Sequence, residues 1–556
     1  MANTVPSGSM ASTKAELPLP PIYNLDFDIL WTIFWMNANL HWTRRRILQD
    51  EWSSFDGPRA LNVLRHTSQV CRQWRDITLG SPSLWGMAIE IDLLMAHQED
   101  YWTKEVMERA GQSPLYVSGR FDAFRPGPRN FFTTLLNKSW ERIRRLDVAI
   151  TRGRYLSSET WNVLFRPSPE LEVIRIQNVA GWLPKLLTDE EPHPSIFADV
   201  APALREFSIE EAPSELFSLQ APWLSQLHSL ILSSHFAFNA TDVLVVLARI
   251  PTLEYLELKH ILRPLKEQLM PVYLPRLRTL NILTDFTTSL FLLKWITPPA
   301  GSTLILHIFN DHNDISNQDM HSFCLEITRY IDNFFSHAPF AKSLVLEPGG
   351  RTFKIRGWRS SDETESSTDH ADFIISVEPR GAIRIPELGP QKLLASLSTC
   401  RFTHTTTFEF LPSGALGSDL IPLQPSFMEL FSSLLSVEHL VASAHGLRVL
   451  LYFQESSPNT IIFPLLETLR LRAVGKKDPF PTSNPVSSFL KWRITAGKPV
   501  TTLDVSESIL SEQWLDWTHL DEIEGLKVIL RHDENDAEEY ICGTGEPERL
   551  NLRSGF

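Results

Sequence analysis

The chain has 556 residues, of which 43% are hydrophobic and 21% charged, so its composition is globular and supplies enough apolar material for a large core. Its formal net charge of −14 argues against extensive binding to nucleic acids or anionic membranes, because both need a basic face. The four cysteines lie far apart and form no CxxC pair, which argues against a disulfide framework or a zinc site and suits a reducing compartment.

Residues 1–18 are small and polar and include prolines, a composition that favours disorder. They contain no apolar stretch that could form the core of a signal peptide. The longest apolar runs of the chain, such as 243–248, are far shorter than the roughly 18 residues that a membrane span requires. We therefore expect a soluble protein of the cytoplasm, the nucleus or both.

A helical module is predicted over residues 19–90. In its first part, apolar residues recur at three- and four-residue spacing, which places them on one face of a helix. These residues are Leu25, Ile29, Leu30, Ile33 and Phe34. Residues 37–59, which include a Gly57-Pro58 turn, are interpreted as an insertion between this helix and the next.

The second helical pattern of this module runs from Leu61 to Ile77. It stops at residues 80–82, Gly-Ser-Pro, which strongly break a helix, and Leu84 and Trp85 follow directly. A helical module of this length has a thin core and is marginal alone. It must therefore pack either on the rest of the chain or on a partner.

From about residue 140 a different pattern repeats, with apolar residues at positions one, four and six. It is typical of a short strand whose last two apolar side chains point inward. The middle apolar residues Leu230, Leu256, Leu280 and Leu304 follow at intervals of 26, 24 and 24 residues, the period of a leucine-rich repeat. The copies are 143–148, 171–176, 204–209, 227–232, 253–258, 277–282 and 466–471, with looser ones at 437–442, 500–505 and 526–530.

The positions of proline support the repeat. In five copies, a proline stands two residues before the first apolar position. Proline cannot donate to a strand ladder and belongs at the entrance of a strand. The five are Pro169, Pro202, Pro251, Pro275 and Pro464. We predict an irregular leucine-rich-repeat-like solenoid over 91–532; several unrelated α/β domains are the alternative.

The repeat pattern degrades between residues 310 and 425, where segments 341–346 and 406–410 are irregular copies that could carry the sheet onward. The polar and acidic segment 358–372 is interpreted as an extruded loop. The acidic, Gly-containing tail 533–556 is expected to fray. The predicted fold class is therefore α/β, with an all-α module at the front and an α/β solenoid behind it.

Three stretches of the front module carry a specific combined motif. They are 28–34, Asp-Ile-Leu-Trp-Thr-Ile-Phe; 68–77, Ser-Gln-Val-Cys-Arg-Gln-Trp-Arg-Asp-Ile; and 81–86, Ser-Pro-Ser-Leu-Trp-Gly. Together they resemble the F-box of the large F-box families of mushroom-forming fungi. Segments 108–115 and 489–503 also look like parts of these proteins. The family usually has Leu-Pro where this chain has Leu25-Asp26, and often Glu where it has Asp28.

The resemblance implies an adaptor function. An F-box docks a Skp-type adaptor, which bridges to the cullin of a ubiquitin ligase, while the following repeats bind a protein substrate. The adaptor-facing residues that the resemblance implies are Leu25, Ile29, Leu30, Ile33, Phe34, Val70, Trp74, Leu84 and Trp85. Candidate contacts to the substrate on the strand face are Arg175, Glu257, Lys259 and Arg470.

Two other classes of function are the alternatives to this one. Asp26 and the long insertion leave open a leucine-rich-repeat-like protein-binding scaffold with no ubiquitin-ligase role. An enzyme is disfavoured, because the chain has no Gly-rich phosphate loop, GxSxG elbow, HExxH helix or paired Cys/His cluster. We therefore expect no catalytic residues, no cofactor and no metal.

Overall fold

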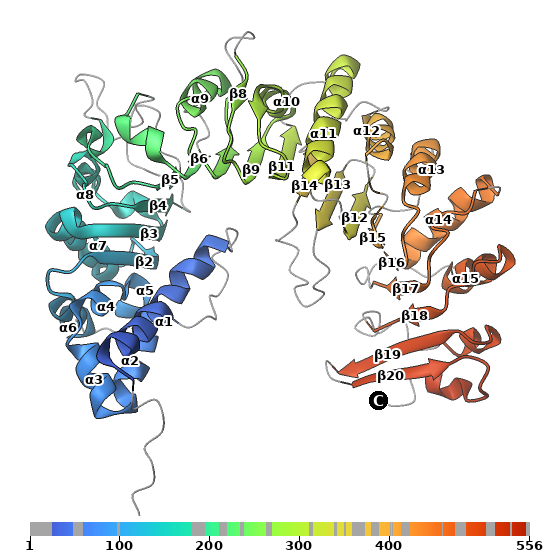
Figure 1. Cartoon of the computed structure of the whole chain (residues 1–556), viewed down its shortest axis with the longest axis horizontal. Coiled ribbons are helices and arrows are strands. Elements are labelled where there is room, and N and C mark those ends of the chain that lie inside the picture. The colour runs from blue at the N-terminus through green and yellow to red at the C-terminus, as the bar shows by residue number, and fades with distance from the viewer. Residues whose placement is uncertain are drawn as a thin grey trace, which may run out of the picture. The chain divides into compact units, whose positions relative to one another are not determined.

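The computed structural model describes residues 25–551 outside the gaps at 48–58, 97–100, 179–194, 211–219, 234–237, 263–269, 311–314, 338–341, 350–351, 359–372, 380–388, 401, 403, 413–422, 459, 473–484, 507–516 and 534–535. The segment predicted to be disordered, 1–18, and all but the first residue of the predicted loop 358–372 lie outside the described residues. The fold is mixed α/β, and most of its strands are parallel (Figure 1).

The chain forms two compact units. The first consists of Met1–Phe121, Arg125–Phe132 and Arg142–Val148, and the second of Asp122–Phe124, Thr133–Glu141 and Ala149–Phe556. Helix α7 (Pro126–Ser139) and strand β3 (Ile143–Thr151) contribute residues to both units.

The first unit is mainly helical. Strands β1 (Ile89–Glu90) and β2 (Leu115–Asp122) pair in parallel at its end. Its helices are α1 (Phe27–Ile47), α2 (Ala60–Val70), α3 (Arg72–Leu79), α4 (Pro82–Gly86), α5 (Ile91–Leu94) and α6 (Tyr101–Ala110). Helix α1, predicted from the spacing after Leu25, continues into the predicted insertion 37–59; residues 48–58 of that insertion are not described.

The second helical pattern corresponds to two helices instead of the one predicted. Cys71, between α2 and α3, is extended with φ −154° and ψ 174°, so the helical ladder breaks there. The Cys71 Sγ atom accepts a hydrogen bond from the amide of Trp74 at 3.5 Å and caps the start of α3. Helix α3 ends at Leu79, before the breaker at 80–82, as predicted.

A buried carboxyl group ties β1 to the start of α2. Glu90 is 1% exposed, and its Oε1 accepts a hydrogen bond from the amide of Ala60 at 2.7 Å. A carboxyl group at a helix N-terminus is favoured by the helix dipole. Arg59 lies 3.9 Å from the other oxygen of Glu90 and forms an ion pair with Asp92.

This carboxyl group makes stability depend on pH. Burial raises the pKa of Glu90 from 4.5 to about 7, although Arg59 opposes the shift. The stability that the group contributes is therefore fully present below about pH 4.5 and is lost as the pH rises through about 7. We expect Glu90→Gln to remove a pH-dependent part of the unfolding free energy of up to about 3 kcal/mol. Urea denaturation of both proteins over this pH range measures it, and parallel curves would contradict the expectation.

The strands of the second unit form two parallel runs that are joined through one antiparallel strand. The first run pairs in the order β4 (Val173–Asn178), β5 (Glu206–Glu210), β6 (Ser229–Ser233), β7 (Tyr255–Lys259), β9 (Thr279–Thr284) and β11 (Thr303–Asn310). The second pairs in the order β12 (Ser343–Pro348), β15 (Thr407–Phe410), β16 (His439–Ala442), β17 (Thr468–Leu471), β18 (Thr502–Asp504) and β19 (Lys527–Asp533). A separate small pair consists of β8 (Val272–Tyr273) and β10 (Ile296–Thr297).

The predicted apolar positions of the repeat are buried. In segments 171–176, 204–209, 227–232, 253–258, 277–282 and 466–471, positions one, four and six are at most 3% exposed. Leu230, Leu256, Leu280 and Leu304 are aligned on neighbouring strands, as the interval of 24 to 26 residues predicts. Equal positions therefore stack strand over strand to form the core of this unit.

The recurring proline lies in a turn that introduces each strand. In all five cases the amide of the first apolar residue bonds to the carbonyl three residues earlier, at 3.1 to 3.4 Å, as Leu253 does to Ile250. Proline thus occupies the second position of a β-turn, where its fixed φ is favourable. This turn explains why proline recurs two residues before the first apolar position of these copies.

The degraded stretch of the repeat holds the antiparallel strand. Strand β14 (Phe373–Pro379) pairs in parallel with β11, and β13 (Phe353–Trp358) lies antiparallel between β14 and β12. The irregular copies 341–346 and 406–410 do carry the sheet onward, as β12 and β15. The sequential order of strands is nevertheless reversed here, which repeat spacing could not predict.

Helices follow one side of these strands, as Figure 1 shows. Consecutive helices from α9 to α13 contact each other, and α14 contacts α15. They are α8 (Ser158–Trp161), α9 (Ala240–Leu247), α10 (Phe286–Trp295), α11 (Asn317–His337), α12 (Gly389–Ser398), α13 (Gln424–Ser433), α14 (Ala444–Ser456) and α15 (Pro485–Thr495).

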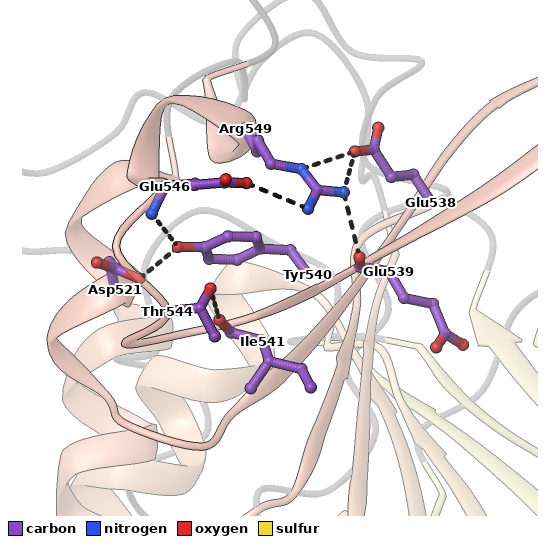
Figure 2. A network of polar contacts seen from close by, with 8 residues as sticks. All are labelled: Asp521, Glu538, Glu539, Tyr540, Ile541, Thr544, Glu546 and Arg549. Atoms are coloured by element: carbon purple, nitrogen blue, oxygen red, sulfur yellow. Dashed lines mark hydrogen bonds and ion pairs between the residues drawn. The ribbon is translucent and has the colours of Figure 1, made fainter.

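The tail expected to fray from residue 533 instead contains folded elements among its described residues between 536 and 551. Strand β20 (Asp536–Ile541) pairs antiparallel with β19. Figure 2 shows what holds it: the buried Tyr540 donates to Asp521 at 2.7 Å, and Arg549 lies over the Tyr540 ring and pairs with Glu538 at 2.6 Å. A buried aromatic residue supplies the core contact that acidic composition alone did not predict.

Candidate functional site

Helix α1 carries two apolar stripes. Leu30 and Phe34 belong to the first and are at most 1% exposed. Ile29, Ile33 and Met36 follow at spacings of four and three residues and belong to the second, in which Ile29 is 48% and Met36 57% exposed. A helix needs only one apolar stripe for its own core, and an exposed second stripe is typical of a surface that a partner covers.

Other members of the predicted docking set are also accessible to solvent. Val70 at the end of α2 is 59% exposed, whereas Leu25 and Trp74 are half-buried. The ring of Trp74 lies 4.9 Å from that of Phe34, tilted by 58°. Trp74 therefore anchors on the core with one side and keeps another part of its surface open.

Four residues of the predicted docking set are buried within the first unit: Leu30, Phe34, Leu84 and Trp85. Trp85 is 1% exposed, donates from Nε1 to the carbonyl of Thr78 at 2.8 Å, and lies under the guanidinium group of Arg109 at 4.6 Å. Such residues support the fold and offer a partner little surface. The accessible part of the set is thus reduced to Leu25, Ile29, Ile33, Val70 and Trp74.

The predicted substrate contacts all lie on strands of the second unit. Their neighbours along each strand are buried leucines and isoleucines, so alternation points them to the opposite face of the sheet, the strand face. All four are engaged in ion pairs within the chain. The pairs are Arg175–Glu206 at 2.7 Å, Lys259–Glu257, and Arg470–Asp504 at 2.9 Å.

A polar centre lies on this strand face at β7 and β9. The carboxylate of Glu257, only 5% exposed, accepts hydrogen bonds from the Tyr255 hydroxyl and the Lys259 ammonium group. Asn281 is aligned with Glu257 on the next strand and is 8% exposed. Its Oδ1 has no hydrogen-bond partner within the described residues. A buried acceptor without a partner costs free energy, and this atom itself is covered by the surrounding chain.

Apolar side chains flank the polar centre. In register, Ile231 stands beside Glu257 on β6, and Ile305 stands beside Asn281 on β11. Both isoleucines are half-buried. Apolar surface next to a few oriented polar groups is typical of protein-binding surfaces, in which burial supplies affinity and hydrogen bonds supply specificity.

Sequence reasoning missed Tyr255 and Asn281. The signal was present, because both alternate with buried leucines of the predicted strands. Choosing only charged residues as candidates left them out. Met36 was missed since the predicted helical face ended at Phe34, although Met36 continues the i, i+4, i+7 spacing from Ile29.

A hollow of about 670 Å³ lies beside the turns before β9 and β11. Its charged lining includes Glu254 and Arg278, which lie 3.6 Å apart, and Glu254 also lies 3.6 Å from His228. Partly exposed ion pairs of this kind have low energy. Among the described residues, no group of three or more His, Cys, Asp or Glu side chains could hold a metal ion. None of the described helices has the length and hydropathy of a membrane span.

Comparison of the sequence with models of known protein families gives no match, and comparison with curated proteins also gives none. The function is therefore inferred from the two surfaces and from the motifs of the sequence.

Proposed function

We propose that the chain is the substrate-recruiting subunit of a Skp–cullin–F-box ubiquitin ligase. The helices of the first unit dock a Skp-type adaptor, through which the chain joins a cullin. The strand face of the second unit, a leucine-rich-repeat-like solenoid, binds a protein substrate. The observation that carries the proposal is the exposed apolar stripe of α1, with Ile29 at 48% and Met36 at 57% exposure.

The energetics of the first unit support docking. Covering an isoleucine such as Ile29 removes apolar surface from water, and full burial of such a side chain is worth about 1.5–3 kcal/mol. The half-buried Trp74 adds an aromatic anchor already fixed against Phe34. The F-box-like motif at 68–77 includes the end of α2, the break at Cys71 and most of α3, and the motif at 81–86 includes α4.

The strand face supports substrate binding. Glu257, Lys259 and Asn281 place an oriented ion pair and an unsatisfied acceptor between apolar side chains. The half-buried side chains of Tyr255, Lys259, Ile231 and Ile305 are the accessible surface that a substrate segment would contact. Lys259 is the more exposed partner of the ion pair, so a positively charged segment would meet repulsion there.

We expect co-expression with a Skp-type adaptor to give a complex that survives gel filtration. Ile33→Asp places a charge in the apolar stripe, and Trp74→Ala removes the anchor, so each should weaken adaptor binding by about tenfold or more. Isothermal titration with purified adaptor measures the change. Leu325→Asp is the matched control, since Leu325 is a 59% exposed apolar residue on α11 of the second unit.

Folded variants that bind the adaptor as tightly as the original chain would contradict the docking surface. Recovery of a protein ligand without adaptor or cullin would instead favour the binding scaffold with no ligase role. The two surfaces can be separated in the same experiment. Affinity recovery from the native cell with Glu257→Ala should lose the substrate and retain the adaptor, whereas Ile33→Asp should do the reverse.

A further inference from the structure

An exposed cluster of arginines and aromatic rings lies in the second unit and includes no residue of either surface above. Phe124 follows strand β2, and Arg152, Arg154 and Tyr155 follow strand β3. The Arg152 guanidinium lies 4.9 Å from the centre of the Phe124 ring. Phe124 meets Tyr155 edge to face with ring centres 5.1 Å apart, and the Arg154 guanidinium lies 5.2 Å from the Tyr155 ring. The four side chains form one continuous series of contacts, the arginine–aromatic cluster.

The backbone around this cluster is held in place. Asp122 accepts two hydrogen bonds from Arg152, one of them from Nε at 2.9 Å, and a third from the amide of Phe124 at 3.0 Å. Arg152 has φ 54° and ψ 42°, the left-handed region that is unfavourable for residues other than glycine. The Asp122 carboxylate thus ties the side chain of Arg152 to the backbone at Phe124.

The cluster remains open to solvent despite this ordering. Phe124 is 53% exposed and Tyr155 38% exposed, and the Arg152 side chain is 50% exposed. Aromatic residues and arginine are the types enriched where proteins bind each other. Groups that are already ordered lose little conformational entropy on binding. The arrangement therefore favours a binding surface over a contribution to the core.

The charge of the cluster specifies the partner. Arg154 is exposed, and within the described residues it forms no ion pair. Arg152 is paired with Asp122, so among the described residues Arg154 carries the unpaired positive charge of the cluster. A polyanion such as a nucleic acid would be repelled by the rest of this acidic chain. A short acidic segment of a protein supplies the carboxylate that Arg154 lacks and presents much less charge to the rest of the chain.

We propose that the arginine–aromatic cluster docks an acidic segment of a protein partner. A carboxylate of that segment accepts hydrogen bonds from Arg154, and an adjacent apolar side chain packs on Phe124 and Tyr155. This contact is independent of the ligase role, since it uses neither the stripe of α1 nor the polar centre on β7 and β9.

The test uses the full chain and two pools of short fluorescein-labelled peptides. In the first pool Asp or Glu alternates with Phe, Leu, Tyr or Trp, and in the second Lys or Arg replaces the acidic residues. Fluorescence anisotropy should show binding of the acidic pool only, weakened by added salt because the contact is exposed. Arg154→Glu and Phe124→Ala should each weaken it by about tenfold or more.

Arg249→Glu is the matched control, since Arg249 is exposed in the same unit and lies outside the cluster. Thermal unfolding checks that each variant is folded, and Arg154→Ala replaces Arg154→Glu if the charge reversal prevents folding. Equal binding of both pools, no binding of the acidic pool, or unchanged binding by the folded cluster variants would each overturn the proposal.

Discussion

Replacing Trp85 by alanine is expected to lower the free energy of unfolding of the first unit by about 3–5 kcal/mol. The side chain is 1% exposed, so its removal leaves a cavity that the surrounding helices fill only in part. The carbonyl of Thr78 also loses its donor, the indole Nε1 at 2.8 Å. Denaturation of the full chain by guanidinium chloride, followed by circular dichroism, measures the loss.

Trp74→Ala is the matched comparison, because it removes the same side chain from a half-buried position on the neighbouring helix. We expect it to cost about 1–2 kcal/mol of stability, since part of the ring is hydrated in the folded chain. The two variants should therefore separate core from docking: Trp85→Ala acts on stability, and Trp74→Ala acts on adaptor binding. A Trp85→Ala chain with full stability and no adaptor binding would reverse that assignment.

Arg493→Met is expected to destabilise the second unit by about 3 kcal/mol or more. Arg493 on α15 is 1% exposed and donates to the carbonyls of Ile462 at 3.0 Å, Phe463 at 3.3 Å and Leu466 at 3.5 Å. These carbonyls belong to the turn that introduces β17, in which Phe463 has a positive φ of 51°. Methionine keeps the apolar part of the side chain but leaves three buried acceptors without this donor.

Burial lowers the pKa of Arg493 to about 10, so the side chain remains charged at neutral pH and its hydrogen bonds are charge-assisted. Arg493→Lys keeps the charge, but an ammonium group lacks the planar fork with which the guanidinium group reaches three carbonyls. We therefore expect a loss of stability between those of the other two proteins. Urea denaturation compares the three proteins. If Arg493→Met leaves the free energy of unfolding unchanged, the turn before β17 is held by its own proline and leucine contacts.

Short-range spacing predicted a large part of this molecule. The helical period after Leu25, the breaker at 80–82 and the strand positions of the repeat all appear where expected. Each depends on neighbours a few residues apart, which the sequence presents directly. The proline offset is of the same kind, since it reports a four-residue turn such as the one before Leu253.

Long-range packing decided what spacing could not. Leu30 and Ile29 are adjacent and both apolar, yet one is buried and the other 48% exposed, because α2 and α3 cover only one side of α1. The reversed order of β12, β13 and β14 and the folding of the tail around Tyr540 likewise depend on residues far apart in the chain.

The sequence by itself determined which residues could be apolar strand positions, which could be helical, and which motifs resemble an F-box. Tertiary structure alone decided which tryptophan is core and which is accessible, that Asn281 has an acceptor without a partner, and that Arg152 stacks on Phe124. The physical reason is that periodicity specifies the direction of a side chain relative to its own element, whereas exposure and contact depend on what other elements place in front of it.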